Sequence, residues 1–371
     1  MRVLCLNAGS SSLKAAGFVI DRPDADPARV VSQLVERVGV PSGPDHLAAL
    51  DAVANAFSRA GFAPVDVIAH RLVHGGPNLV DHVVVDAAVR AELATAVPIA
   101  PVHLPAALAV FDAASARYPG RPHVACLDTA FHRHLLPAAR RLPIPGELDA
   151  VGVRRYGFHG LSYEYLVHRL GPALGRRAVL AHLGNGASLA AVRDGIGIDT
   201  TMGFTPSGGL VMGTRTGDLD PGVLVFLLRS GRVDIDGLEH LVDHESGLLG
   251  LSGHSGDVRD LLDARDAGDA RSALALEVYE SVAAKHVAAL TTVLGGLDTV
   301  VFTAGVGEHA ASVRASIAAR LGHLDVTIDR EANEANQAII SPSDAPVTVR
   351  VERTDEEWIM AHHAARLTSV R

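Results

Sequence analysis

A polar turn at residues 7–14 holds side chains of this chain that are well suited to binding a phosphate. The turn follows the apolar run 3–6 and precedes a second apolar run at 15–20, so the pattern predicts a β-hairpin. Its small residues would let a phosphate approach the backbone, where amides, hydroxyls and the cation of Lys14 can surround the oxygens. An ordinary serine-rich turn has the same composition, and the turn alone leaves both interpretations open.

Four further clusters of glycine, histidine and charged residues interrupt the apolar segments. Each places polar side chains just after a β-like run, where α/β proteins gather their ligand sites. The clusters are residues 70–76 (HRLVHGG), 128–132 (DTAFH) with 155–160 (RYGFHG), 182–186 (HLGNG) leading to 199–203 (DTTMG) and 212–218 (MGTRTGD), and 302–308 (FTAGVGE).

Known nucleotide and metal motifs are missing from these clusters. No Gly-x-x-x-x-Gly-Lys-Ser/Thr run occurs, which argues against a P-loop enzyme. The glycine pair Gly305 and Gly307 lacks the third glycine of a dinucleotide fingerprint, because residue 310 is alanine. The chain has 19 histidines but neither His-Glu-x-x-His nor paired Cys-x-x-Cys, so a zinc site is not expected. The pattern favours a phosphate-binding cleft built from glycine turns.

Charge and cysteine content restrict the partners. With 33 basic and 42 acidic residues the formal charge is −9, which argues against nucleic-acid binding and against a membrane surface. Any anionic ligand must be held by local positive charge. Cys5 and Cys126 both lie in apolar runs and are expected to be free thiols. With no signal peptide and no apolar segment of about 18 residues, we expect a cytoplasmic protein.

Apolar β-like runs alternate with alanine- and leucine-rich segments of helical spacing, which predicts an α/β fold with mixed sheets. The β-like runs, beyond the hairpin, are 65–68, 83–85, 124–127, 178–183, 189–192, 300–303 and 347–351. The helical segments are 45–60, 86–96, 104–116, 162–171, 271–294 and 308–320.

A length of 371 residues predicts about two domains. The proline- and glycine-containing stretch 140–152 is the best hinge, which gives an N-terminal domain of 1–149 and a C-terminal domain of 150–356. We expect the terminal helix, 357–371, to pack back on the first domain. Both halves begin with an apolar run and a glycine turn (NAGS at 7–10, GNGAS at 184–188), which indicates two related domains facing one cleft.

In register, eight strings of this sequence resemble the acetate kinase family, and the resemblance extends from residue 2 to about residue 361. It implies two duplicated ribonuclease-H-like domains with mixed sheets around a nucleotide cleft, as in the actin/sugar-kinase/chaperone superfamily. The implied reaction is reversible, Mg²⁺-dependent phosphoryl transfer from ATP to acetate, giving acetyl phosphate and ADP. The strings are NAGSSSLK (7–14), HRLVHGG (70–76), DTAFH (128–132), YGFHG (156–160), HLGNG (182–186), GFTP (203–206), MGTR (212–215) and FTAG (302–305).

This chemistry needs no general base, because a carboxylate nucleophile is already ionised at pH 7. It needs positive charge around the in-line path. By the resemblance, Arg71 holds the acetate carboxylate and Arg215 stabilises the transferring phosphoryl group. His159 donates a hydrogen bond to that group, and Asp128 orients Arg71 or metal-bound water. Outside the resemblance, the arginines are compatible with surface ion pairs and His159 with a helix cap.

The resemblance also implies binding residues. Asn7 and Glu356 are expected to hold Mg²⁺, for which Mn²⁺ can substitute, and Glu357 is the alternative carboxylate because the acidic run could shift by one position. ATP is expected to contact Lys14, His182, Asn185, Gly186, Asp257, Arg259, Gly305 and Val306. The acetate methyl group is expected among Val73, Val102, Phe158 and Pro206.

Three questions stay open at this point. The chain departs from the usual family residues at several positions, among them Leu104, Leu161 and Tyr163, so a propionate or butyrate kinase is an alternative. A non-catalytic nucleotide-binding protein of the same superfamily is another, and it predicts loss of the two arginines. A homodimer is expected, and the apolar segment 221–228 fits either the dimer contact or the core.

Overall fold

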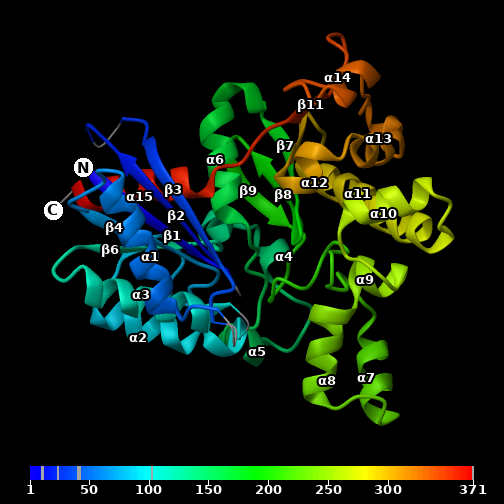
Figure 1. Cartoon of the computed structure of the whole chain (residues 1–371). Helices are drawn as coiled ribbons and strands as arrows, with labels where there is room; N and C mark the ends of the chain where they lie inside the picture. The colour runs from blue at the N-terminus through cyan, green and yellow to red at the C-terminus, as the bar shows by residue number, and fades with distance from the viewer. Residues whose placement is uncertain (10–11, 23–24, 40–42, 102, 370–371) are drawn as a thin grey trace.

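The computed structural model of the chain describes residues 1–9, 12–22, 25–39, 43–101 and 103–369. Ser10 and Ser11 of the polar turn at residues 7–14 and Val102 of the expected acyl pocket lie outside the described residues. Two sheets, each with helices against it, form the molecule (Figure 1). The predicted mixed α/β class is therefore confirmed.

The first sheet has the strand order β3-β2-β1-β4-β6-β5. Strands β1 and β2 form the predicted antiparallel hairpin, in which Asn7 pairs with Lys14. β4 is parallel to both β1 and β6, so the carboxyl ends of these three strands lie at one edge. The strands are β1 (Arg2–Ala8), β2 (Ser12–Val19), β3 (Ala28–Glu36), β4 (Val67–Leu72), β5 (Val83–Val84) and β6 (His123–Leu127).

Alternation along β1 divides its apolar side chains between two helical layers, since successive residues of a strand face opposite sides of the sheet. Val3 and Cys5 pack with Ile359 and Met360 of α15 (Glu356–Ser369). Leu4 and Leu6 pack on the other face with residues of α1 (His46–Arg59) and α3 (Leu104–Arg117). The C-terminal helix thereby brings its first residues to the edge of the sheet where β1 ends (Figure 1).

The second sheet repeats the plan of the first. Its strand order, β11-β10-β7-β8-β9, corresponds to β6-β4-β1-β2-β3 of the first sheet. In both sheets three antiparallel strands are followed by two strands parallel to the central one. The duplication expected from the two glycine turns is confirmed. The strands are β7 (Arg177–Leu183), β8 (Ala187–Arg193), β9 (Ile196–Thr200), β10 (Thr299–Thr303) and β11 (Thr348–Val351).

The long helix α11 (Ala270–Leu294) packs against the second sheet and anchors its core. The single helix expected at 308–320 is two helices, which break at Ala310. The remaining helices are α2 (Ala87–Thr95), α4 (Pro137–Arg140), α5 (Gly146–Ala150), α6 (Gly160–Leu170), α7 (Pro221–Arg229), α8 (Ile235–His240), α9 (Gly247–Ser252), α10 (Val258–Asp266), α12 (Ala304–His309), α13 (Ala311–Ala319) and α14 (Arg330–Glu334), with short irregular turns at Val97–Ile99, Ala130–His134, Gly171–Leu174, Leu241–Glu245 and Gly322–Leu324.

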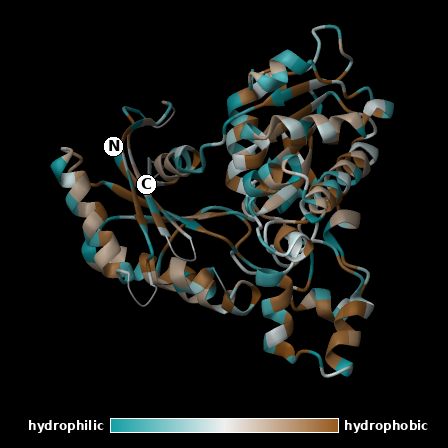
Figure 2. Ribbon diagram, turned by 45° about the vertical axis from the view of Figure 1, so that its right-hand side comes forward, coloured by the Kyte–Doolittle hydropathy of each residue, from teal (hydrophilic) through white to brown (hydrophobic). Residues whose placement is uncertain are grey.

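Helices α7 and α8 project from the second body as a helical hairpin in which hydrophobic residues, brown in Figure 2, stand among polar ones. No residue of α7 is buried, and Phe226 is 59% exposed. The interpretation of segment 221–228 as core is therefore wrong. Along the described ranges, no helix is both long enough and apolar enough to cross a membrane.

Candidate active site

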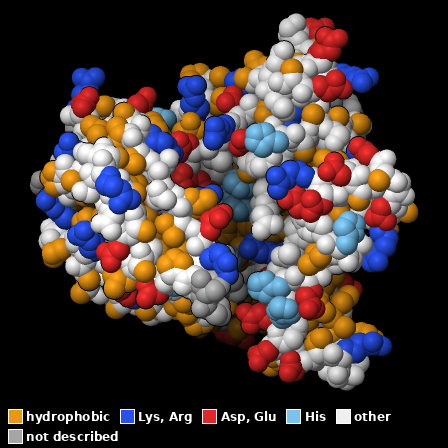
Figure 3. Space-filling model, viewed as in Figure 1, with side chains coloured by type: hydrophobic (Ala, Val, Ile, Leu, Met, Phe, Trp, Pro, Cys, Tyr) orange, Lys and Arg blue, Asp and Glu red, His pale blue; other side chains and the backbone are white. Residues whose placement is uncertain are grey.

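A cavity of about 550 Å³ lies where the carboxyl ends of the two sheets face each other. Figure 3 shows a hollow between the two bodies in which charged and histidine side chains gather. The predicted site residues that line the cavity are Asn7, Lys14, Arg71, Val73, Asp128, Phe158, His159, His182, Asn185, Gly186, Pro206, Arg215, Gly305 and Glu356, together with Glu357. A larger hollow of about 810 Å³ lies beside α13 and α14 and contains none of them.

Arg71 is held by Asp128 at the edge of the first sheet. Arg71 is the penultimate residue of β4, and Asp128 directly follows the neighbouring parallel strand β6. The guanidinium binds the carboxylate through two atoms, with Nε to Oδ1 at 3.0 Å and one terminal nitrogen to Oδ2 at 2.7 Å. Its other terminal nitrogen donates to Asn7 Oδ1 at 3.2 Å. This two-pronged geometry fixes the plane of the guanidinium.

The charge state of the pair follows from burial and pairing. Burial opposes the charge on Arg71, but Asp128 and Glu356 raise the pKa of Arg71 above its ordinary value. Burial raises the pKa of Asp128, and the arginine acts in the opposite direction. The Asp128 side chain is only 2% exposed and both its oxygens face Arg71. The arrangement fits an orienting role for Asp128 and leaves it poorly placed to accept a substrate proton.

Asn7 and two glutamates form an oxygen-rich corner of the cavity. The Asn7 amide nitrogen lies 3.4 Å from Glu356 Oε2 and 3.3 Å from Glu357 Oε1. Glu356 also lies 3.5 Å from Arg71. Glu357 lies 3.6 Å from Arg29, an arginine that does not line the cavity. Hard oxygen donors with few protein ligands suit Mg²⁺, which keeps several waters. Both carboxylates fit the ion, and Glu356 is the one turned toward the arginine.

His159 approaches the cavity from the start of α6. Its φ of 58° is in the left-handed region, which costs a non-glycine residue energy, and such strain is a known feature of active sites. His159 occupies the N-cap position of α6, as the helix-cap alternative expects, but its side chain makes no capping hydrogen bond. The ring stacks on that of His182 with centroids 4.1 Å apart. Burial depresses the pKa of His159, and it lowers the pKa of His182 to about 3, so both rings are neutral.

Arg215 enters the same cavity from the second body. One terminal nitrogen donates to Pro206 O at 3.2 Å, and the other lies 3.5 Å from His103 Nε2. Among the described residues no carboxylate oxygen lies within 4 Å of its guanidinium, so it is no surface ion pair. Burial lowers the pKa of Arg215. A partly buried cation without a carboxylate partner, open to a cavity, is prepared to bind an anion.

His103 is a cavity residue that the sequence analysis missed. It lies beside Arg215, and burial together with this arginine lowers its pKa to about 4. The signal that could have found it is the string APVH at 100–103, where a histidine stands next to the expected acyl-pocket residue Val102.

The nucleotide side of the cavity is formed by glycine turns at the ends of β7 and β10. A Cβ atom placed on Gly186 would lie 3.3 Å from His159 Nε2 and 3.4 Å from Arg215, so glycine permits this close approach. Three residues expected to bind ATP do not line the cavity. Asp257 and Arg259 form an exposed ion pair of 2.6 Å at the start of α10, and Val306 packs against the hydrophobic core of the second body.

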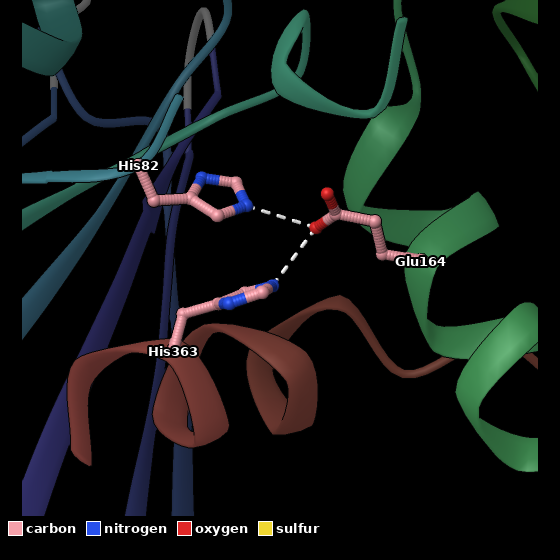
Figure 4. Close-up of side chains that lie close together, drawn as sticks. All are labelled: His82, Glu164 and His363. Carbon is pink, nitrogen blue, oxygen red and sulfur yellow. Dashed lines mark hydrogen bonds and ion pairs between the residues drawn. The ribbon is translucent and has the colours of Figure 1, made fainter. Parts of the chain in front are cut away.

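A second cluster of ionisable groups joins the first sheet to α6 and α15. His82 Nε2 and His363 Nε2 each lie 2.9 Å from Glu164 Oε2 (Figure 4). A metal ligand needs a bare ring nitrogen. His82 Nδ1 accepts a hydrogen bond from the Leu127 N–H at 3.0 Å, so the neutral ring carries its proton on Nε2. The trio is therefore a hydrogen-bonded anchor between elements and does not suit a metal.

Glu164→Gln is expected to destabilise the fold. Burial alone would raise the pKa of Glu164, but His82 and His363 outweigh it and hold this pKa well below its usual range. The carboxylate thus contributes stability above its unfolded pKa of about 4.3, and the contribution is lost as pH falls through the lower folded value. At pH 7 the variant should lose about 1–3 kcal/mol, seen as a lower thermal midpoint, with the difference from wild type shrinking in acid.

The matched control is Glu147→Gln, because Glu147 is exposed on α5. It should leave the thermal midpoint almost unchanged at either pH. Equal midpoints for wild type and Glu164→Gln at pH 7 would show that the cluster carries no stability.

Comparison with known proteins places the chain in a family. The model of the acetokinase family matches residues 2–362. The acetate kinase of Micrococcus luteus is 42% identical over 387 residues, covering 99% of this chain and 100% of that protein. The chain belongs to the acetokinase family. An acetate kinase of Clostridioides difficile is likewise similar, at 39% identity over 400 residues, covering 99% of this chain and 100% of that protein.

Solved structures of acetokinases have the same fold. Porphyromonas gingivalis acetate kinase is 34% identical and superposes with a TM-score of 0.89, covering 99% of both chains. A propionate kinase from Francisella tularensis is 30% identical with a TM-score of 0.92, again covering 99% of both. The resemblance drawn from the eight strings is confirmed over the whole chain, and both acyl specificities occur among its structural neighbours.

Proposed function

We propose that this acetokinase transfers the γ-phosphoryl group of ATP to the carboxylate of acetate, reversibly and by direct in-line attack. The observation that carries the proposal is that Arg71 and Arg215 reach one cavity from opposite bodies of the molecule. The reaction brings two anions together, and positive charge placed between them lowers the barrier most. A non-catalytic protein of the superfamily would have no need for both cations.

In this proposal Arg71 binds the acetate carboxylate, because Asp128 and Asn7 already fix its guanidinium plane. Arg215 meets the charge that develops on the equatorial phosphoryl oxygens. The neutral ring of His159 donates a hydrogen bond to the same oxygens. The acetate oxygen attacks phosphorus, the bond to the ADP oxygen breaks, and no proton is transferred.

Asn7 and Glu356 would hold Mg²⁺, which when bound supplies charge neutralisation of the ATP phosphates. Lys14, His182, Asn185, Gly186 and Gly305 line the cavity where the phosphates would lie. By family resemblance, Asp257, Arg259 and Val306 would contact the adenosine part of ATP. The nucleotide site would then extend beyond the cavity.

The acetate preference is tested by comparing acids of increasing length. Val73 and Phe158 are 9% and 1% exposed and, with Pro206, form the apolar wall of the cavity. Each methylene added beyond acetate is expected to lower kcat/KM, and a hydrophobic pocket discriminates by about 1–3 kcal/mol for such a group. Steady-state kinetics with acetate, propionate and butyrate measure this series. A kcat/KM that rises with chain length would favour the propionate or butyrate alternative.

We also propose that residues 1–149 and 150–356 act as two domains and that the second mediates a homodimer. The exposed apolar side chains of α7, among them Val225 and Phe226, support a contact there, since burial of such a surface drives association. Cys5 and Cys126 are buried free thiols, which supports a reducing cytoplasm. Sedimentation of the purified protein would test the dimer.

A further inference from the structure

Two buried hydroxyl groups lie in a line behind His159. His159 Nδ1 is 2.8 Å from Ser188 Oγ, and Ser188 Oγ is 2.5 Å from the hydroxyl of Tyr163. Ser188 and Tyr163 are both fully buried. Tyr163 stands one helical turn after His159 on α6, and Ser188 belongs to β8, two residues after Gly186. Rigid elements therefore hold all three side chains.

The hydrogen bonds along this line have a direction. Among the described residues, the buried hydroxyl of Tyr163 has one side-chain hydrogen-bond partner, Ser188 Oγ. A buried hydroxyl proton needs an acceptor, so the proton of Tyr163 points at Ser188 Oγ. Ser188 has one proton of its own, and since its oxygen accepts from Tyr163 that proton goes to His159 Nδ1. In this order every hydroxyl donates once and Nδ1 is an acceptor.

A neutral imidazole carries a single N–H, so the direction of the line decides what His159 can do. Burial, His182 and the two arginines keep the ring neutral. With Nδ1 as acceptor the proton resides on Nε2. This atom faces the cavity, because a Cβ on Gly186 would lie 3.3 Å from it. The reverse direction would present a bare lone pair to the phosphoryl oxygens and would repel them.

We propose that Ser188 and Tyr163 are positioning residues that select the Nε2–H tautomer of His159, so that it can donate to the transferring phosphoryl group. The inference rests on the proposed function, in which His159 contacts that group. Ser188 and Tyr163 do not touch substrate. They act through the histidine, in the way that a partner on one ring nitrogen sets the state of the other.

A double-mutant cycle with His159→Gln separates this role from a structural one. A glutamine amide nitrogen can reach the place of Nε2 and is always a donor, so it needs no tautomer selection. Ser188→Ala alone is expected to lower kcat about tenfold, with KM for ATP and for acetate within about twofold. In the His159→Gln background the same change should lower kcat less than twofold. An equal loss in both backgrounds would overturn the proposal.

Tyr163→Phe has a matched control elsewhere in the molecule. It removes the donor to Ser188 and should lower kcat by about threefold. Tyr279 is also a buried tyrosine, and its hydroxyl has no hydrogen-bond partner among the described residues. Tyr279→Phe should therefore leave kcat unchanged. Equal kcat values for the two variants would contradict a role for the Tyr163 hydroxyl.

The tautomer can also be read in the wild-type protein without any turnover. In ¹⁵N-histidine-labelled protein, the signals lost in His159→Gln identify the ring of His159. The proposal predicts a protonated Nε2 and an unprotonated Nδ1 from pH 6 to 8, and an altered ratio in Ser188→Ala. A protonated Nδ1 in wild type would overturn it. Because this spectrum needs no substrate, it judges the tautomer even if acetate proves not to be phosphorylated.

Discussion

Arg71→Ala should lower kcat/KM for acetate roughly 30- to 1,000-fold, which corresponds to a loss of about 2–4 kcal/mol in transition-state stabilisation. The lost guanidinium is the one that Asp128 orients through two hydrogen bonds and that the acetate carboxylate would contact. Arg71→Lys should recover little of this loss, because an ammonium group cannot bind two carboxylates in one plane. Steady-state kinetics with acetate as the varied substrate measure both effects.

The same variant also leaves Asp128 buried without its partner. An uncompensated buried carboxylate destabilises a fold, so the thermal midpoint of Arg71→Ala should fall. Arg71→Ala combined with Asp128→Asn should regain much of the midpoint but none of the activity. Activity that returned with the midpoint would show that Arg71 is structural and would contradict its role in binding acetate.

Arg215→Ala should lower kcat by a similar roughly 30- to 1,000-fold while the thermal midpoint changes little. Arg215 donates to the Pro206 carbonyl and lies beside His103, and among the described residues it forms no ion pair within 4 Å whose carboxylate would lose its partner. Its charge is therefore available to the phosphoryl group, and its loss falls on the transition state. Turnover numbers and thermal unfolding of one preparation would separate the two effects.

Arg330→Ala provides the control for Arg215→Ala. Arg330 pairs with Glu334 on the surface, with 88% of its side chain exposed, so its removal should change neither kcat nor the midpoint. Near-normal turnover in Arg215→Ala would reject the assigned role. A midpoint that fell as far as in Arg71→Ala would show that Arg215 has a structural partner in solution.

Much of the fold could be read from local patterns. The hairpin at the N-terminus and the two glycine turns predicted the duplicated sheets, because apolar runs and turn residues act over short distances. Strands β3 and β9 were missed for physical reasons. β3 is half exposed at a sheet edge and lacks a continuous apolar run, and β9 is a short strand that begins directly after a tight turn.

The site was partly predictable for a similar reason. Arg71, Asp128 and Arg215 belong to polar strings at the ends of strands or in glycine turns, and such strings stand out in the sequence. His103 stands alone before α3, and only the tertiary fold brings it to Arg215. The contact between Ser188 and His159 joins residues 29 positions apart on a strand and a helix. No spacing rule connects two such positions, so the hydrogen bond between Ser188 and His159 could not be inferred before the fold was known.

The enzyme is proposed to phosphorylate acetate in this cavity, and formation of an acyl phosphate is the direct test. Purified protein is incubated with ATP, Mg²⁺ and acetate, and acetyl phosphate is trapped as its hydroxamate. We predict product that requires all three additions, with strong losses in Arg71→Ala and Arg215→Ala. Folded wild-type protein that forms no hydroxamate above a control without enzyme would contradict the proposed function.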